Sequence, residues 1–542
     1  MLLELMRWIK HKAWKRGRRT DAQNILKSKW VLKWKDIGQG ESKSRKIKAR
    51  LVAQGFLDKQ VTDTFAGTST RWSQRLLIAI AVQNAWNLWS ADISEAFLRG
   101  LSFEELHQQG GELRQVEISL PPGGEHLLRS IGGYENYDPE AEVLIMLKPG
   151  FGLKDAPRLW LLALKRVLTK AGVVATNIDP QLFCMHREGR LVLLMTIHVD
   201  DIKLCGEPKF LQSVVSHLES HFDALKLEKD SFVHLGLQHE LQPDGSITVS
   251  QTHYIAELKP IPTDRLKALP KESEVDDEYK HLFMSLLGGI AWVVQTRLDV
   301  AVFVGALQRR LQKPTVQDII NLNRVLSYIK SKPLIMKFKK LNNPWRLIAV
   351  SDSGFKGEDQ DHLAIRSGVI CLVDRDFPKI GANDIQVIEF VSKKQTRVCR
   401  STYTAELFSA LDISGLLFNI SLTLAEVLNG PSSARKLAED FENGRLPLES
   451  DLIIDAAAVF DGIAAAEPKV PNDTTMTIHA LKLRELLSLQ QINRLIWIDT
   501  RSMLADGLNK GSVDRLALRT AVECGRWDIN QDVRVHKAQS SS

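Results

Sequence analysis

The sequence has few cysteines and no pattern that would join them. The five cysteines of this 542-residue chain are widely scattered, and no two form a Cys-x-x-Cys pair. A zinc ribbon and a disulfide framework are therefore not supported, and a reducing compartment is expected. The sequence also lacks an uninterrupted apolar run of the roughly 18 residues that a membrane span needs. Because no apolar core with a small-residue cleavage site follows the N-terminus, we expect neither membrane insertion nor secretion.

The composition is that of a folded chain with a basic N-terminal end. Hydrophobic residues make up 44% and charged residues 25%, and the length predicts two to four domains. Residues 1–50 hold 16 Lys and Arg against four Asp and Glu, whereas the whole chain carries only +7. Residues 1–20 fit either a polyanion-binding arm or a solvated basic leader. In residues 27–50 aromatic and apolar residues interleave the charges, which favours folded strands that contact nucleic acid or a nucleotide.

Hydrophobic periodicity predicts mixed helices and strands in at least two units. The first unit holds two hairpins, two helices and a short strand, predicted at 29–56, 180–199, 71–86, 157–172 and 88–92. Residues 100–140 are rich in Gly and Glu and are expected to be loop or insertion. Residues 275–333 are mainly helical, and a new series of strands starts at Trp345 after a seam at 338–345. The fold class is therefore α+β or α/β, with several domains.

Two adjacent aspartates follow the strongly apolar strand that ends at Val199. Asp200 and Asp201 need a cationic partner there, because ionised carboxylates at the end of a buried strand are costly. Asp92 closes another apolar strand. Together, such carboxylates suit two divalent metal ions for in-line phosphoryl transfer. Spacing alone leaves the alternative open, since Asp-Asp pairs are common in turns.

A second set of acids lies further along the chain. Three stand at the end of a predicted strand or the start of a helix, and the fourth follows a helical start; they are Asp352, Glu406, Asp455 and Asp506. Taken singly, an Asp at a strand end is more often a cap than a metal ligand.

The motifs around both sets resemble one family. The first set lies among KARLVAQGF (48–56), ADISEAFLRG (91–100), SLPPG (119–123), KPGFGLKDAPRLW (148–160) and HVDDIKLCG (198–206). Their order and spacing resemble the reverse transcriptase of copia-type retrotransposons, a group of transposable elements. VSDSGFKG (350–357), RSTYTAEL (400–407), LIIDAAAV (452–459) and WIDTRSMLADGLNK (497–510) resemble the RNase H domain that follows that polymerase.

The resemblance implies a right-hand polymerase with fingers, palm and thumb, followed by an RNase H-like domain. The boundaries it implies are a basic leader at 1–25, fingers and palm at 26–225, thumb or connection at 226–340, an RNase H-like domain at 345–515 and a C-terminal tail at 516–542. Catalytic, metal-binding roles fall on Asp92, Asp200, Asp201, Asp352, Glu406, Asp455 and Asp506. Each site is expected to hold two Mg²⁺ or Mn²⁺ ions.

The same resemblance implies nucleotide-binding residues and partners. The nucleotide pocket would include Lys48, Arg50, Phe97, Lys154 and Asp155, with Phe97 excluding a ribose 2′-hydroxyl unless it is plain core. The implied partners are an RNA template, a DNA primer, an RNA–DNA hybrid and deoxynucleoside triphosphates. The implied location is intracellular, in a cytoplasmic particle or the nucleus, with no membrane as a partner. Whether the chain forms a dimer is left open.

Three positions depart from the family pattern. His198 stands where the family usually has Tyr, Asp155 where it has Gln, and Ala456 where it has Asn. Asp155 is expected to repel phosphate unless Lys154 or Arg158 neutralises it. These departures motivate an alternative, a decayed retroelement product that binds nucleic acid without polymerase activity. An unrelated basic α/β protein is the third interpretation, which the ordered motifs disfavour.

Overall fold

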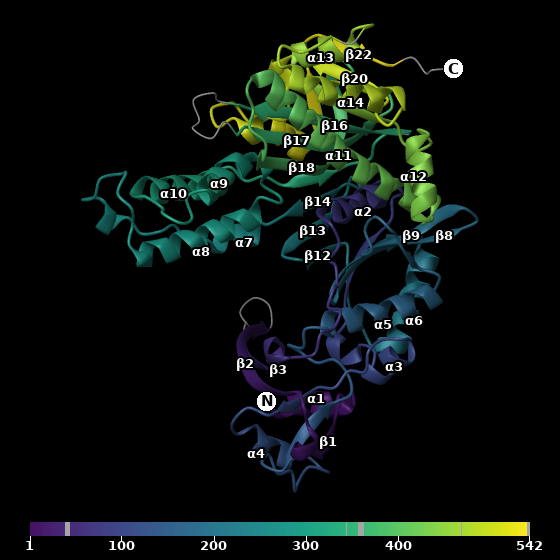
Figure 1. Cartoon of the computed structure of the whole chain (residues 1–542), viewed down its shortest axis with the longest axis vertical. Helices are drawn as coiled ribbons and strands as arrows, with labels where there is room; N and C mark the ends of the chain where they lie inside the picture. The colour runs from purple at the N-terminus through teal and green to yellow at the C-terminus, as the bar shows by residue number, and fades with distance from the viewer. Residues whose placement is uncertain (38–43, 343, 356–362, 468, 539–542) are drawn as a thin grey trace.

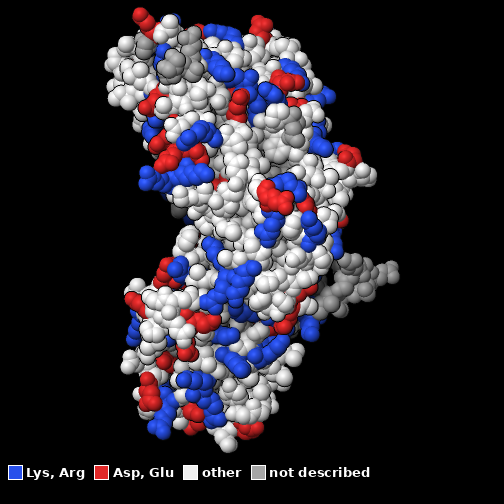
Figure 2. Space-filling model, turned by 90° about the vertical axis from the view of Figure 1, so that its right-hand side faces the viewer, with Lys and Arg blue, Asp and Glu red and all other residues white. Residues whose placement is uncertain are grey.

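The computed structural model describes residues 1–37, 44–342, 344–355, 363–467 and 469–538. Residues 38–43 of the hairpin predicted at 29–56 and the end of the motif at 350–357 therefore lie outside the described residues. Four sheets follow one another along an elongated molecule, with the N-terminal sheet at one end and the C-terminal sheet at the other (Figure 1). Figure 2 shows the same elongated shape from the side.

The N-terminal sheet has five strands in the order β1-β6-β5-β2-β3. They are β1 (Trp14–Arg18), β6 (Glu142–Met146), β5 (Glu117–Ser119), β2 (Ile25–Ile37) and β3 (Ser44–Ala53). Three helices accompany them, α1 (Leu2–Lys10), α3 (Phe103–Gln108) and α4 (Gly124–Arg129). The predicted basic hairpin is the β2–β3 pair. Residues 1–25 are not a solvated leader, because Leu5 and Trp8 of α1 are fully buried.

The second sheet has six strands in the order β11-β4-β10-β9-β8-β7. They are β11 (Lys226–Lys229), β4 (Leu88–Asp92), β10 (Asp201–Gly206), β9 (Arg190–His198), β8 (Leu182–Arg187) and β7 (Val174–Ala175). Helix α2 (Arg71–Gln83) packs with residues of one face, and α5 (Ala156–Lys170) and α6 (Pro208–Phe222) pack with residues of the other. Burial on both faces explains why β9 is an almost continuous apolar run.

A four-stranded sheet and a group of helices follow. The strands are β12 (Ser231–His234), β13 (Leu237–Leu241), β14 (Ile247–Ser250) and β15 (Met336–Phe338). The helices are α7 (Thr252–Glu257), α8 (Asp277–Val293), α9 (Ala301–Gln308) and α10 (Val316–Ser331). These helices form an arm that projects sideways beside the C-terminal sheet (Figure 1).

The C-terminal sheet has seven strands in the order β21-β18-β17-β16-β19-β20-β22. They are β21 (Arg526–Ile529), β18 (Gly381–Lys394), β17 (Ile365–Asp374), β16 (Trp345–Gly354), β19 (Ser450–Ile454), β20 (Arg494–Ile498) and β22 (Val533–His536). The helices are α11 (Thr402–Asn429), α12 (Ala434–Glu442), α13 (Ala457–Ala464), α14 (Thr477–Ser488), α15 (Asp506–Asn509) and α16 (Leu516–Cys524). The predicted tail at 516–542 is wrong, because it supplies α16 and both edge strands of this sheet.

Helix α11 is long and apolar enough to cross a membrane by length and composition alone. However, 61% of its 18-residue apolar window is buried inside the protein, and the helix packs along β16 and β17. Burial of this kind is the ordinary property of a core helix.

The second and C-terminal sheets are joined by a buried ionic contact. Arg71 of α2 donates to Glu389 Oε1 at 2.7 Å and stacks over the Phe390 ring at 4.0 Å, both on β18. Arg75, also on α2, is buried and donates to the Ile388 carbonyl at 3.2 Å. One apolar core runs through α2, the second sheet and the C-terminal sheet, so these parts pack as a single body.

Candidate active sites

The first acid cluster is set by strand register. Asp92 ends β4 and lies directly opposite Asp201, the first residue of β10, in an antiparallel pair. Between β9 and β10, Val199 has a φ of +62°, which a β-branched residue rarely adopts. The Trp160 indole donates to the Val199 carbonyl at 2.7 Å, and the Asp200 carbonyl accepts from Ile93 N–H at 3.3 Å. The left-handed turn lets Asp200 and Asp201 avoid the strict face alternation of a strand.

Burial and mutual repulsion raise the pKa values of two of these carboxylates. Burial raises the pKa of Asp200, and the charge of Asp92 raises it further. Burial, followed by the charges of Asp200 and Asp92, raises the pKa of Asp201 to about 6. Arg50 and Lys48 act on Asp200 in the opposite direction, which places the basic hairpin within electrostatic reach of the cluster. A bound cation would relieve this repulsion and favour the ionised forms of Asp200 and Asp201.

Basic and aromatic side chains from the N-terminal sheet face this region. Lys48 is partly desolvated beside Arg50, and burial lowers its pKa. The Arg50 guanidinium lies over the Phe151 ring at 5.0 Å, and Phe97 meets the same ring edge-on at 5.5 Å. Phe97 is only half buried, between the cores of the first and second sheets. Its ring is therefore held by packing while part of it stays accessible.

Asp155 is not an exposed charge that repels a phosphate. Its carboxylate is buried and accepts from Arg114 Nε at 2.7 Å, and Arg114 also pairs with the buried Asp58 at 2.5 Å. Lys154 lies 3.5 Å from Asp58 Oδ2, so the predicted nucleotide ligands Lys154 and Asp155 belong to one ionic network. Neither Lys154 nor Arg158 is the hydrogen-bonded partner of Asp155; Arg158 pairs with Asp63 at 2.9 Å. Arg114 stands in the segment expected to be loop, and no local signal marked it.

The second acid cluster lies at neighbouring strand ends of the C-terminal sheet. Asp352 near the end of β16 and Asp455 just after β19 are brought together because the two strands run parallel side by side. Glu406 comes from the second turn of α11. Ligand oxygens of these three acids lie within 4.8 Å of one another, the one such group of three found in the described part of the chain. Asp506, the fourth predicted acid, begins α15.

Hydrogen bonds and one lysine support this cluster. Asn509 Nδ2 donates to Asp352 Oδ2 at 2.9 Å, and Thr500 Oγ1 donates to Asp455 Oδ2 at 2.8 Å. Lys510 Nζ lies 3.1 Å from Asp352 Oδ2 and 2.5 Å from Asp506 Oδ1. The sequence pattern had not distinguished Lys510 from its neighbours. It joins the first and last acids of the set, which are 154 positions apart.

The electrostatics of the second cluster favour a bound cation. Burial and the charges of Asp352 and Asp455 raise the pKa of Glu406 to about 10. Burial, followed by interaction with Asp352, raises the pKa of Asp506 to about 8 and that of Asp455 to about 6. Asp352 Oδ1 is buried without a hydrogen-bond partner among the described residues. An orphaned carboxylate oxygen among three further acids fits a hard divalent ion such as Mg²⁺.

Comparison with known proteins gives the family of the part of the chain that holds the first cluster. Residues 11–260 match the family model described as reverse transcriptase (RNA-dependent DNA polymerase). These residues therefore form a reverse transcriptase-family domain, and the prediction for this part of the chain is confirmed.

The chain is also similar to Pol polyproteins of plant transposons. The chain is 26% identical over 422 residues to the retrovirus-related Pol polyprotein from transposon RE1 of Arabidopsis thaliana, covering 74% of this chain and 26% of that protein. It is 27% identical over 420 residues to the corresponding protein of transposon RE2, again 74% and 26%. The protein of transposon TNT 1-94 of Nicotiana tabacum is 25% identical over 328 residues, 56% and 23%. The chain thus spans about a quarter of the length of these relatives.

Proposed function

We propose that the chain is an RNA-directed DNA polymerase of a copia-type retrotransposon with RNase H activity on RNA–DNA hybrids. The observation that carries the polymerase part is the register of Asp92 against Asp201, with Asp200 in the adjoining left-handed turn, inside the family-matched region. In this proposal the first sheet is the fingers, the second the palm, residues 226–340 the thumb or connection, and the C-terminal sheet the RNase H-like domain.

The proposal assigns the metals to the two acid clusters. Asp92, Asp200 and Asp201 would hold Mg²⁺ or Mn²⁺ in the first, and Asp352, Glu406, Asp455 and Asp506 in the second. When bound, the ions supply charge stabilisation for phosphoryl transfer. Around the first cluster, the cations of β3 contribute through their own charge, because Arg50 and Lys48 act to lower the pKa of Asp200. They are placed to attract the triphosphate of a deoxynucleotide.

Primer extension tests the polymerase part. The full chain is incubated with a primed RNA template, deoxynucleotides and Mg²⁺, beside Asp200→Asn and Asp201→Asn. Loss of a metal-binding carboxylate should reduce extension by more than about 10²-fold, by the size of effect usual for such groups. Asp277→Asn, an exposed residue at the start of α8, serves as the matched control. Equal extension by the parent and Asp200→Asn rejects the proposal.

A decayed product that binds nucleic acid without polymerising is the second candidate. His198 and Ala456 favour it, since His198 lies directly opposite Asp201 in the β9–β10 hairpin and Ala456 offers no side-chain cap to α13. Asp155 no longer favours it, because Arg114 neutralises that charge. Cleavage of the RNA strand in a hybrid, beside Glu406→Gln, discriminates the two. Hybrid binding with neither extension nor cleavage supports the decayed product.

A further inference from the structure

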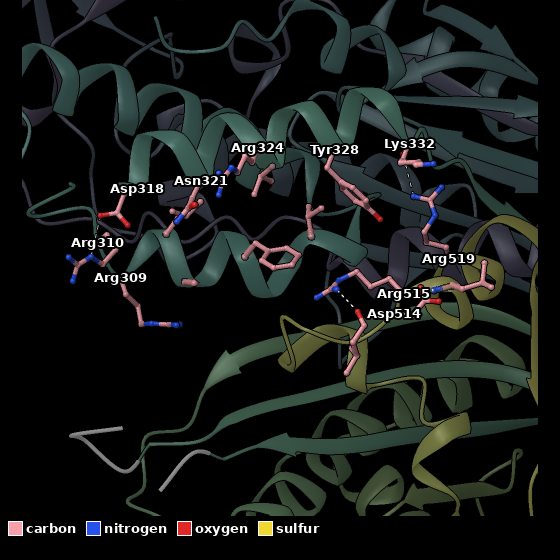
Figure 3. A pocket seen from close by; sticks show the side chains of 17 residues that line it. Arg309, Arg310, Asp318, Asn321, Arg324, Tyr328, Lys332, Asp514, Arg515 and Arg519 are labelled. Carbon is pink, nitrogen blue, oxygen red and sulfur yellow. Dashed lines mark hydrogen bonds and ion pairs between the residues drawn. The ribbon is translucent and has the colours of Figure 1, made fainter. Parts of the chain in front are cut away.

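A groove of about 1140 Å³ lies between the helical arm and the C-terminal unit. Helices α9 and α10 form one wall, and the segment from Val513 to Arg519 forms the other. Figure 3 shows Arg309 and Arg310 at one end of this groove and Lys332 and Arg519 at the other, with Arg324 between them on α10.

The groove is strongly basic. Six of its 17 lining residues are cationic and two are acidic; the cations are Arg309, Arg310, Arg324, Lys332, Arg515 and Arg519. Among the residues that the structure describes, the side chains of Arg324 and Lys332 make no hydrogen bond or ion pair, and both are exposed. Arg309 donates to the Gly305 carbonyl of its own helix at 3.1 Å and meets no acid. Several cationic heads are therefore available to an anion.

The groove adjoins the second acid cluster through the backbone. Arg515 donates to the Lys510 carbonyl at 2.9 Å, and the Lys510 side chain contacts Asp352. The position of a Cβ on Gly511 would be 3.5 Å from the Phe303 ring, which lines the groove. The segment that carries Asp506 and Lys510 of the second cluster therefore continues directly into the wall of the groove.

We infer that this groove binds the phosphate backbone of an RNA–DNA hybrid whose RNA strand occupies the second acid cluster. The inference rests on the proposed nuclease function of that cluster. The phosphates of a duplex recur along its length. Cations spread from Arg309 to Lys332 therefore match a duplex backbone better than they match a single small anion. Cations that neutralise phosphates release counterions, so their contribution is recognised by its dependence on salt.

Salt-dependent binding tests the inference. The full chain with Asp455→Asn, which prevents cleavage, is titrated with a labelled RNA–DNA hybrid between 50 and 200 mM salt. In that background Arg309→Ala with Arg324→Ala should lower the slope of log affinity against log salt by about one for each cation removed. The matched control is Arg375→Ala with Arg435→Ala, which removes the same charge from exposed positions away from the groove. Arg375 follows the β17 residue paired with Trp345, at the far end of β16 from Asp352.

The outcomes separate the groove from the nuclease. A weaker, less salt-dependent groove variant beside an unchanged control supports the inference, even if the parent chain cleaves no hybrid in a separate assay. Equal slopes in the groove and control variants overturn it, as does a parent chain that binds no hybrid. Inorganic pyrophosphate that binds the parent more tightly than it binds Arg309→Ala with Arg324→Ala, at concentrations that leave hybrid binding unchanged, shows a small-anion site instead and also overturns it.

Discussion

Arg114 donates from Nε to Asp155 at 2.7 Å, and both side chains are 2% exposed. Arg114→Ala should lower the free energy of unfolding by about 3–5 kcal/mol, because it leaves Asp58 and Asp155 buried without their shared cation. Urea unfolding of the full chain measures this. Arg526→Ala removes an exposed arginine paired with Asp528 and should cost at most about 1 kcal/mol.

Asp155→Gln restores the residue usual in the family and gives a second measure of the same network. Since the carboxylate is buried against Arg114, its removal should not raise nucleotide incorporation, and the protein should become less stable. Primer extension and urea unfolding on the same preparations check both. A rise in incorporation would show that the charge of Asp155 reaches the nucleotide after all.

Local pattern accounts for much of the fold. Residues within one element are enough to predict several parts of it. These are the β2–β3 and β8–β9 hairpins, α5 with Pro157 in its first turn, and the strand ending at Asp92. The burial of Leu5 and Trp8 was not predicted, because residues 1–25 are highly charged and these two side chains are buried by contacts with distant strands. The edge strands β21 and β22 were also missed, because β21 is defined by its pairing with β18 and β22 by its pairing with β20.

The site residues divide in the same way. Acids at strand ends, such as Asp352 and Asp455, are visible because an ionised group after an apolar run is unusual. Arg114 and Lys510 could not be predicted in this way. Arg114 pairs with Asp155, 41 positions away, and Lys510 contacts Asp352, 158 positions away. Sequence alone also overstated the effect of Asp155, whose charge is balanced in three dimensions.

Phe97 provides a test of sugar selection. Its half-buried ring is held edge-on against Phe151 at 5.5 Å. Phe97→Val should raise incorporation of ribonucleotides relative to deoxynucleotides by about 10- to 100-fold, the size of discrimination that a pocket wall exerts against one added hydroxyl. Single-nucleotide extension measures the ratio. Phe151→Leu keeps Phe97 and should lower both incorporations together; an unchanged ratio in Phe97→Val would make Phe97 a packing residue only.

Lys510 tests whether the second cluster is a metal site. Lys510→Met removes the cation that contacts Asp352 and Asp506. In a chelator the variant should lose about 2 kcal/mol, less than a fully buried pair because Lys510 is one-third exposed. Mg²⁺ should then raise its thermal midpoint more than it raises that of the parent.

The control for Lys510 is Lys482→Met, which breaks an exposed pair with Glu485 on α14. It should change neither the midpoint in chelator nor the response to Mg²⁺. Equal Mg²⁺ responses in all three proteins would contradict a metal site at Asp352.

The contact between α2 and β18 predicts cooperative unfolding of the second and C-terminal sheets. Arg75 is buried, lies 5.4 Å from the Phe390 ring and is within 4.0 Å of Glu389. Arg75→Ala should cost about 3–5 kcal/mol by leaving Glu389 less compensated. Calorimetry should show one transition shared by both sheets in the parent and two separated transitions in the variant. Two transitions in the parent would contradict the single packed body.

His234 gives a pH dependence with a defined sign. Burial, followed by the charge of Lys203, lowers its pKa to about 2, against an ordinary value of 6.5. Between these values the unfolded chain binds a proton that the folded chain does not, so folding stability falls as the pH drops below 6.5. His234→Gln should reduce this loss of folding stability by about 1.4 kcal/mol for each pH unit. Urea unfolding at pH 6.5 and pH 5 measures it.

The matched control for His234 is His281→Gln, since His281 is exposed on α8. Its stability should fall between pH 6.5 and 5 as much as that of the parent. His239, whose pKa is also lowered by burial and Lys203, remains in both variants and keeps part of the dependence. His234→Gln should therefore flatten the stability profile without abolishing its slope, and a slope equal to that of His281→Gln would mean that His234 is protonated in the folded protein.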